Sequence, residues 1–249
     1  MVEVSNLRRA AVLLMSLPED EAATLLSRLP PRQVEAVSIE IAKLGEASVR
    51  RIYGDFAASA MRGWAEVLPR HAIVPHQNFA YTQGKNSADI ALVIDAMDLL
   101  HSGRFDGFCL VSSDSDFTRL ASRIREQGLD AYGFGQMKTP EAFRQACKRF
   151  FFTENLMPQP AESAAAPGAG KEPPSRAAPL IRTAVAELED DEGWIALGAL
   201  GTQLQKIAPD FDTRTYGSSK LSGLLDKTGL FEIDRAAQPI RVRLKPQRR

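Results

Sequence analysis

Cysteine, net charge and long apolar runs are all scarce in this sequence of 249 residues, and each scarcity excludes a class of protein. The two cysteines, Cys109 and Cys147, are too few for a disulfide scaffold or a cysteine-based zinc site, so we expect buried, reduced thiols. Because 31 basic residues balance 31 acidic ones, binding to nucleic acid or membrane must come from local patches. No apolar run approaches the ~20 residues of a membrane helix, and the N-terminus lacks a signal-peptide pattern. We therefore expect a cytoplasmic protein without membrane insertion.

A segment rich in proline, alanine and glycine divides the chain. It spans residues 157–179 and shows no apolar periodicity. Such a composition cannot bury enough surface to order itself, so we expect a disordered linker. The linker separates a large N-terminal part from a small C-terminal module at residues 180–249.

Most of the N-terminal part has the alternating pattern of an α/β fold. Apolar strand-like runs and amphipathic helical segments alternate between residues 48 and 156, with strands expected near 49–54, 73–80, 105–111, 129–134 and 150–153. Repeating strand–helix units of this length imply right-handed crossovers and a parallel sheet. We expect a Rossmann-like parallel-sheet domain over residues 45–156.

Two aspartates follow one of these strands directly. The apolar run Phe108–Val111 ends in Ser112 and Ser113, and Asp114 and Asp116 come next. In open α/β sheets, ligands bind at the carboxyl ends of the strands, and two carboxylates there favour a divalent cation. The alternative is that Asp114 only caps the following helix, because Asp and Ser are common at that position.

Helix geometry sorts the other acids that could join this pair. Asp89 lies in the first turn of a helix expected over residues 87–101, which begins at the same sheet edge. Asp95 and Asp98 lie about 9 and 13 Å further along it at 1.5 Å per residue. We expect Asp95, Asp98 and Asp106 to be solvated, and Asp55 stays possible as an outer partner. Lys85 and Asn86 are candidate phosphate or substrate contacts, although the polarity of their loop explains them equally well.

Several motifs in order resemble the bacterial NYN domain of the LabA-like group, which has the PIN-like nuclease fold. They are Arg51–Phe56, Phe79–Tyr81, Gly84–Asp89, Ile94–Leu99 and Ser112–Phe117. The resemblance covers residues 40–156 and implies a metal-dependent ribonuclease. On that resemblance, Asp89, Asp114 and Asp116 match the acids of the metal site and would hold Mg²⁺ or Mn²⁺ for catalysis. We also expect Lys85, Asn86 and Ser113 to contact the substrate.

The C-terminal module has the pattern of a winged helix. Three helical segments precede two strand-like runs, Phe231–Ile233 and Ile240–Leu244, and winged helices commonly bind nucleic acid with the third helix and the wing. Residues 216–221, 224–225 and 231–233 resemble the OST-HTH, or LOTUS, domain, which implies RNA binding. The candidate contacts are Arg214, Tyr216, Lys220 and Lys227, with added phosphate contacts from Arg241, Arg243, Lys245, Arg248 and Arg249. A solvated basic face on a protein-interaction module is the alternative.

Residues 1–44 differ from the usual start of an NYN domain. The resemblance implies that such a domain begins with a hydrophobic strand ending in an aspartate. Helical spacing and proline-containing turns favour three short helices instead, near residues 7–16, 20–29 and 31–44. Residues 9–18 and 39–45 resemble the N-terminal helical domain of the flagellar motor-switch protein FliG. The domain would then lack its first strand, and residues 5–44 could bind a protein partner. Alternatively, Ala10–Leu14 fills the vacant strand position and Met15 stands where the aspartate belongs.

The combined pattern predicts an RNA-binding protein with a metal-dependent, ribonuclease-type domain. Without an acid at the end of a first strand, the activity would be impaired, because Mg²⁺ demands oxygen ligands that methionine cannot supply. The alternative function is a catalytically inactive RNA-binding or scaffold protein.

Overall fold

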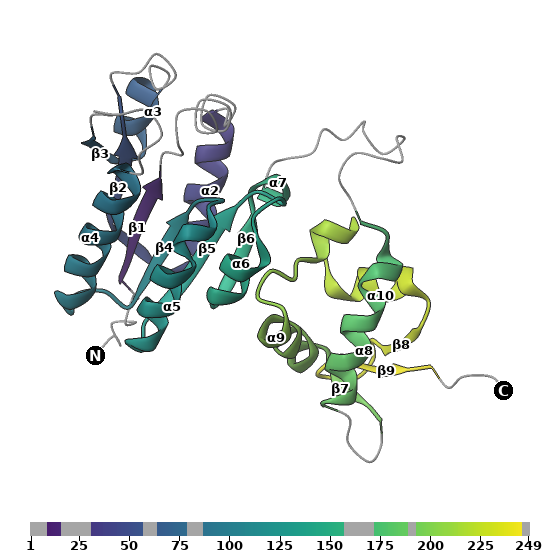
Figure 1. The fold of residues 1–249 in the computed structure, drawn as a ribbon. Coiled ribbons are helices and arrows are strands. Elements are labelled where there is room, and N and C mark those ends of the chain that lie inside the picture. Colours follow the sequence, from purple (N-terminus) through teal and green to yellow (C-terminus); the bar gives the residue numbers. More distant parts are fainter. Residues whose placement is uncertain are drawn as a thin grey trace, which may run out of the picture. The chain divides into compact units, whose positions relative to one another are not determined.

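The protein consists of two compact units, residues 1–158 and 159–249, in a computed structural model (Figure 1). The structure describes residues 9–15, 31–56, 64–78, 87–156, 172–188 and 193–245. Within the helices and strands, side chains are described from Glu35 onward, except for those of residues 65–67. None of the helices in these ranges is long and apolar enough to cross a membrane.

The N-terminal unit is built on a parallel sheet of six strands. In chain order these are β1 (Arg9–Met15), β2 (Glu46–Gly54), β3 (Val74–Gln77), β4 (Gly107–Val111), β5 (Asp130–Gly135) and β6 (Arg149–Phe152). Their spatial order is β3-β2-β1-β4-β5-β6, and every neighbouring pair is parallel. This is the doubly wound strand order, and it confirms the α/β parallel-sheet fold expected from the alternating pattern.

The helix expected at residues 7–16 is wrong, because Arg9–Met15 forms the central strand β1. Leu13 pairs with Arg51 of β2 and with Leu110 of β4, so β1 has hydrogen-bonded neighbours on both sides. A central parallel strand is covered on both faces and therefore reads as a continuous apolar run, which periodicity cannot distinguish from a helix. The domain therefore has a first strand, contrary to the main prediction. The alternative, in which Ala10–Leu14 fills the strand position, is confirmed. The second expected helix, Asp20–Leu29, lies outside the described residues.

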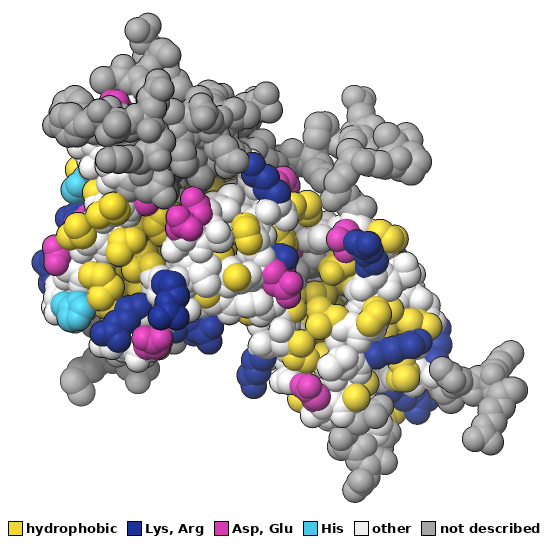
Figure 2. All heavy atoms as spheres, viewed as in Figure 1, with side chains coloured by type: hydrophobic (Ala, Val, Ile, Leu, Met, Phe, Trp, Pro, Cys, Tyr) yellow, Lys and Arg dark blue, Asp and Glu magenta, His cyan; other side chains and the backbone are white. Residues whose placement is uncertain are grey.

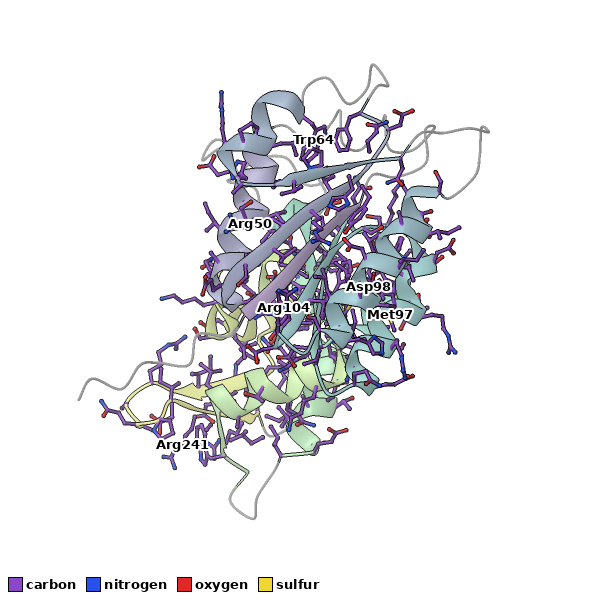
Figure 3. The ribbon with its side chains drawn as sticks, turned by 90° about the vertical axis from the view of Figure 1, so that its left-hand side faces the viewer. Arg50, Trp64, Met97, Asp98, Arg104 and Arg241 are labelled. Carbon is purple, nitrogen blue, oxygen red and sulfur yellow. The ribbon has the colours of Figure 1, made fainter. Side chains whose placement is uncertain are left out.

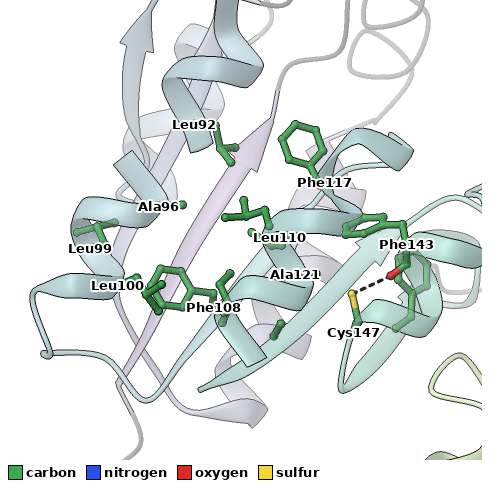
Figure 4. Close-up of a cluster of buried hydrophobic side chains, with 14 of the residues drawn as sticks. Leu92, Ala96, Leu99, Leu100, Phe108, Leu110, Phe117, Ala121, Phe143 and Cys147 are labelled. Atoms are coloured by element: carbon green, nitrogen blue, oxygen red, sulfur yellow. Dashed lines mark hydrogen bonds between the residues drawn. The ribbon is translucent and has the colours of Figure 1, made fainter. Parts of the chain in front are cut away.

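Helices cover the two faces of the sheet with separate apolar cores. On one face, α2 (Pro31–Leu44) places Val37 and Ile41 against Cys109, Phe134 and Phe151. On the other face, the larger core lies beneath α4 (Ser87–His101), α5 (Thr118–Glu126) and α6 (Glu141–Ala146), and Figure 4 shows its side chains. The short helices α3 (Trp64–Arg70) and α7 (Thr153–Leu156) complete the described helices of this unit.

Both cysteines are buried and free, as expected. Cys147 donates its Sγ hydrogen to the carbonyl oxygen of Phe143 at 3.3 Å, which is the dashed line in Figure 4. Burial raises the pKa of each thiol to about 12, so neither is a thiolate at neutral pH.

The C-terminal unit is a small helical domain with a three-stranded antiparallel sheet. Its elements are η4 (Pro174–Arg176), α8 (Ala178–Ala186), β7 (Ile195–Ala196), α9 (Leu197–Ile207), η5 (Thr213–Tyr216), α10 (Leu221–Thr228), β8 (Phe231–Asp234) and β9 (Arg241–Leu244). The sheet order is β7-β9-β8, and the strands share a core with the helices that includes Ile181, Leu200 and Leu224. Three helices and a strand pair match the predicted winged helix.

This domain begins at an earlier residue than predicted, within the range expected to be a linker. Residues 157–179 were expected to be disordered, yet η4 and the start of α8 lie within that range, and Ala177 and Ala178 are buried. The Glu172 amide also donates to the Thr215 carbonyl oxygen at 2.9 Å. Proline in the first turn favours a helix start rather than preventing one, so the proline-rich composition was misleading here.

Candidate functional site

The carboxyl ends of β1 and β4 mark the point where the sheet reverses its winding. From β1 the chain continues to β2 on one side, and from β4 it continues to β5 on the other. Diverging connections leave a crevice outside these strand ends, and ligands of doubly wound sheets bind there. Met15 ends β1, and the segment Ser112–Asp116 follows β4.

Asp114 caps the short helix η2 (Ser115–Phe117) that leads into α5. Its Oδ1 accepts a hydrogen bond from the Asp116 amide at 2.8 Å, and its own amide donates to Ser112 Oγ at 3.0 Å. The helix-cap interpretation is therefore confirmed for Asp114. A cap uses one carboxylate oxygen, so capping and ligand binding are compatible roles for this residue.

The Ser112–Asp116 segment is tied to the end of β5 and to the loop that follows it. Ser113 Oγ accepts from the Gln136 amide at 2.9 Å, and the Ser112 amide donates to the Phe134 carbonyl oxygen at the same distance. Gly135 permits this close approach, because a Cβ there would lie 2.5 Å from the Ser112 carbonyl oxygen. Ser113, expected to contact substrate, thus has a backbone partner that fixes the loop carrying Asp114.

Asp89 approaches this edge from the first turn of α4, as predicted. It is only 7 % exposed, and its Oδ2 has no hydrogen-bond partner among the described residues. Burial, and then the negative charges of Asp114 and Asp116, raise the pKa of Asp89 to about 6. Asp89 is therefore close enough to Asp114 and Asp116 for their charges to act on its carboxyl group.

These aspartates suit a hard divalent cation in chemistry but do not form a complete ligand set. Carboxylate oxygens are what Mg²⁺ and Mn²⁺ prefer, and a buried oxygen without a donor fits a cation. However, the described part of the chain holds no group of three or more His, Cys, Asp or Glu arranged to bind a metal. The adjacent strand β1 ends in Met15 and adds no acid. Lys85 and Asn86 lie outside the described residues.

Asp95 is not solvated, which corrects the prediction. It accepts hydrogen bonds from the Arg51 guanidinium and the Tyr53 hydroxyl, both on β2, and Tyr53 packs against His76 with ring centroids 5.0 Å apart. Although burial acts to raise the pKa of Asp95, the bonds from Arg51 and Tyr53 outweigh it and lower that pKa.

The remaining acids lie outside this cluster. Asp98, labelled in Figure 3, and Asp106 are exposed, as expected. Asp55, considered as an outer partner, accepts from Gln77 Nε2 at 2.6 Å at the end of β3.

The predicted RNA contacts of the C-terminal domain surround η5 and α10. Arg214 is half-buried and donates to both oxygens of Asp212, so part of its hydrogen-bonding capacity is used within the domain. Tyr216 is half-buried and packs against Phe211, with ring centroids 6.0 Å apart. Lys227 Nζ donates to the Gly217 carbonyl oxygen at 2.6 Å, and Lys220 is exposed.

The basic residues at the C-terminal end are also partly paired. Arg241 and Arg243 form ion pairs with Asp234 and Glu232, whereas Arg248 and Arg249 lie outside the described residues. Lys245 Nζ donates to the Gly229 carbonyl oxygen. On the face shown in Figure 2, acidic and basic side chains are interspersed, in keeping with the zero net charge.

Comparison with known families decides the assignment. The family model described as the NYN domain matches residues 22–154, which is more than half of the chain. The chain belongs to the NYN domain family. A second family model, the OST-HTH/LOTUS domain, matches residues 171–241. Both resemblances seen in the sequence are therefore confirmed, whereas the resemblance to FliG finds no support.

Solved structures give partial matches to this NYN protein. A crystal structure of a protein of unknown function from Vibrio parahaemolyticus is 15% identical, covers 60% of the chain and 94% of its own, and has a TM-score of 0.47. A solution structure of an uncharacterized protein from Nitrosomonas europaea is 35% identical over 37% of the chain and 90% of its own, with a TM-score of 0.29. No curated protein matches significantly.

Proposed function

We propose that this RNA-binding, nuclease-type protein hydrolyses RNA phosphodiesters slowly with Mg²⁺ or Mn²⁺, using the acidic edge of its NYN sheet. The observation that carries the proposal is Asp89, whose buried Oδ2 lacks a described partner and whose pKa is raised to about 6 by burial and by Asp114 and Asp116. Three neighbouring carboxylates favour binding of a cation, because their mutual repulsion falls when one is present.

Each residue at this edge has a distinct role in the proposal. Asp89, Asp114 and Asp116 would hold the cation, which when bound activates water and neutralises charge on the phosphodiester. Ser113 acts by holding the loop, because its bond to the Gln136 amide fixes the backbone beside Asp114. Substrate contacts by Lys85 and Asn86 stay predictions. The slow rate follows from β1, since Met15 supplies no oxygen ligand at the reversal point of the sheet.

Cleavage of single-stranded RNA by the full chain tests this proposal. We expect cleavage that requires Mn²⁺ or Mg²⁺ and falls roughly tenfold or more in Asp114→Asn, because a charged ligand is lost. Asp98→Asn is the matched control: it removes an exposed carboxylate of the same domain and should leave the rate unchanged. Cleavage that survives Asp114→Asn undiminished would rule out the site.

A non-catalytic RNA-binding protein is the second candidate function. It is favoured by one observation, the lack of a group of three metal-binding residues within the described ranges. In that case, wild-type protein retains RNA without turnover at any divalent cation concentration, and binding is lost when residues 180–249 are removed. Retention that weakens as salt rises would show the expected phosphate contacts.

Two further expectations from the sequence stay predictions. A protein partner for residues 5–44 would have to bind beyond β1, because Arg9–Met15 lies within the sheet with a strand on each side. The cytoplasmic location is likewise proposed on composition and on the two free, buried cysteines.

A further inference from the structure

One side of the small C-terminal sheet carries an aromatic residue among paired charges. We call it the wing face, and it consists of Trp194, Arg241 and Arg243 with Glu232 and Asp234. In the antiparallel register, Arg243 lies opposite Glu232, and Arg241 lies opposite Asp234. Because Ile195 of β7 pairs with Val242, Trp194, which directly precedes β7, lies next to Arg243.

The alternation of side chains places the wing face away from the domain core. Ile195 and Val242 are 4% and 0% exposed and belong to that core. Successive residues of a strand point to opposite sides of the sheet, so Trp194, Arg241 and Arg243 occupy the outer side. The side chains of Arg241 and Arg243 are 43% and 39% exposed, which leaves them accessible to a ligand.

Both guanidinium groups lie over the indole ring of Trp194. Arg243 Cζ lies 4.4 Å from the centroid of the Trp194 ring, and Arg241 Cζ lies 5.5 Å from it (Arg241 is labelled in Figure 3). Contacts of this length are favourable cation–π interactions. Arg243 Nε and Nη2 bond Glu232 at 2.8 and 2.7 Å, which holds the guanidinium plane in place over the ring.

The paired charges of the wing face argue for base recognition rather than phosphate recognition. Glu232 and Asp234 already neutralise both arginines, and a phosphate would have to approach these carboxylates. A neutral base meets no such repulsion. It can extend the planar stack of Trp194 and Arg243, and the Nη1 hydrogens of Arg243, which Glu232 does not use, can bond its edge.

We propose that the wing face binds single-stranded RNA by stacking an unpaired base on Trp194 and Arg243. This inference rests on the proposed RNA-binding function. It assigns base stacking to a surface other than α10, and it gives Arg243 a role in stacking, where the sequence pattern predicted phosphate contacts from Arg241 and Arg243. Single strands are specified because stacking needs an accessible base face, which a double helix hides between neighbouring base pairs.

Binding of the full chain to labelled oligoadenylate of about 12 nucleotides tests the wing face. We expect Trp194→Ala to weaken binding roughly tenfold, whereas Trp194→Phe keeps a ring and loses less than about threefold. Binding to a duplex RNA of the same length should be equal in wild type and Trp194→Ala. Equal melting temperatures of the variants would show that the domain still folds.

Three outcomes would overturn the inference, and they separate it from the proposed function. If Trp194→Ala binds oligoadenylate like wild type while Lys220→Ala is impaired, RNA binding stands but lies on α10. If Trp194→Ala weakens duplex and single strand equally, base stacking is wrong. If wild-type protein binds neither RNA, the proposed RNA-binding function fails together with the wing face.

Discussion

Helix α4 carries two carboxylates, Asp89 and Asp95, whose surroundings are opposite. Asp89 has Asp114 and Asp116 as charged neighbours, and burial together with these charges raises its pKa to about 6. For Asp95, burial acts in the same direction, but hydrogen bonds from Arg51 and Tyr53 outweigh it and lower the pKa. The two residues are six positions apart on one helix, so local burial alone does not decide their electrostatics.

The difference follows from the side chains that each residue meets at the sheet. Asp95 contacts the second half of β2, where Arg51 and Tyr53 are two residues apart and thus share a face of the sheet. Asp89 lies at the carboxyl edge, where the chain places more acids and β1 ends in an apolar residue. A carboxylate satisfied by its own protein stabilises the fold, whereas one opposed by its neighbours indicates a ligand site.

Replacement of Asp95 should have the largest effect on stability. We expect Asp95→Ala to lower the free energy of unfolding by about 2–4 kcal/mol, because it leaves the Arg51 charge and the Tyr53 hydroxyl without their acceptor in a half-buried site. Denaturant unfolding monitored by circular dichroism measures this change. Asp98→Ala on the exposed side of α4 is the control and should cost less than about 0.5 kcal/mol. Equal losses in the two variants would contradict a structural role for Asp95.

Replacement of Asp89 should change stability in the opposite direction. Its folded-state pKa is about 6, above the ordinary 3.8, so the folded protein holds this proton more tightly than the unfolded chain. Stability from this group is therefore present below about pH 4 and is lost as pH rises to about 6. We expect Asp89→Asn to raise the free energy of unfolding by about 1–2 kcal/mol at pH 8 without divalent cations, and by almost nothing at pH 4.

Unfolding measured from pH 4 to pH 8 tests that sign. Wild-type protein should lose more stability over this range than Asp89→Asn, and the two curves should converge on the acidic side. A variant that is less stable than wild type at pH 8, with no difference in pH dependence, would show that the Asp89 carboxylate stabilises the fold and would contradict this prediction.

Much of the fold could be predicted from the sequence because its elements differ in period. The helix at residues 87–101 begins and ends as predicted, and the predicted strand ends at Val111 as expected. Polar turns mark these boundaries in the sequence. Strand β1 could not be identified, because Ala10–Leu14 is apolar throughout and rich in good helix formers. Pairing with β2 and β4 decides its conformation, and pairing is not visible in the segment itself.

The positions of the candidate acids could be predicted from the sequence, but the partners of other residues could not. Asp89, Asp114 and Asp116 could be placed because helix starts and strand ends share one sheet edge. Arg51 and Trp194 were missed because their contacts join residues far apart in the chain: Arg51 bonds Asp95, and Trp194 meets Arg243. The alternation of Arg51 with Tyr53 on one strand was the available signal for the first of these.

Addition of an acid at the end of β1 should have the smallest effect on stability. Its effect on Mn²⁺ affinity tests the candidate site most directly. Met15 ends β1 in register with Tyr53 of β2, and the preceding Leu14 pairs with Val111 of β4, just before the Ser112–Asp116 segment. We expect Met15→Asp to raise Mn²⁺ affinity about tenfold, because a carboxylate ligand is worth at least ~1.4 kcal/mol to a hard cation. Isothermal titration of the full chain measures this affinity.

The charge of the new residue, rather than its size, should carry the effect. Met15→Asn is the matched control, since it has the same shape as aspartate without its charge. Without metal, Met15→Asp should be the less stable of the two, because a further carboxylate joins Asp89, Asp114 and Asp116, and Mn²⁺ should reverse that order. Equal Mn²⁺ affinity in both variants would contradict a cation site at this edge. An affinity gain that also restores fast RNA cleavage would instead show that Met15 is what limits this nuclease-type domain.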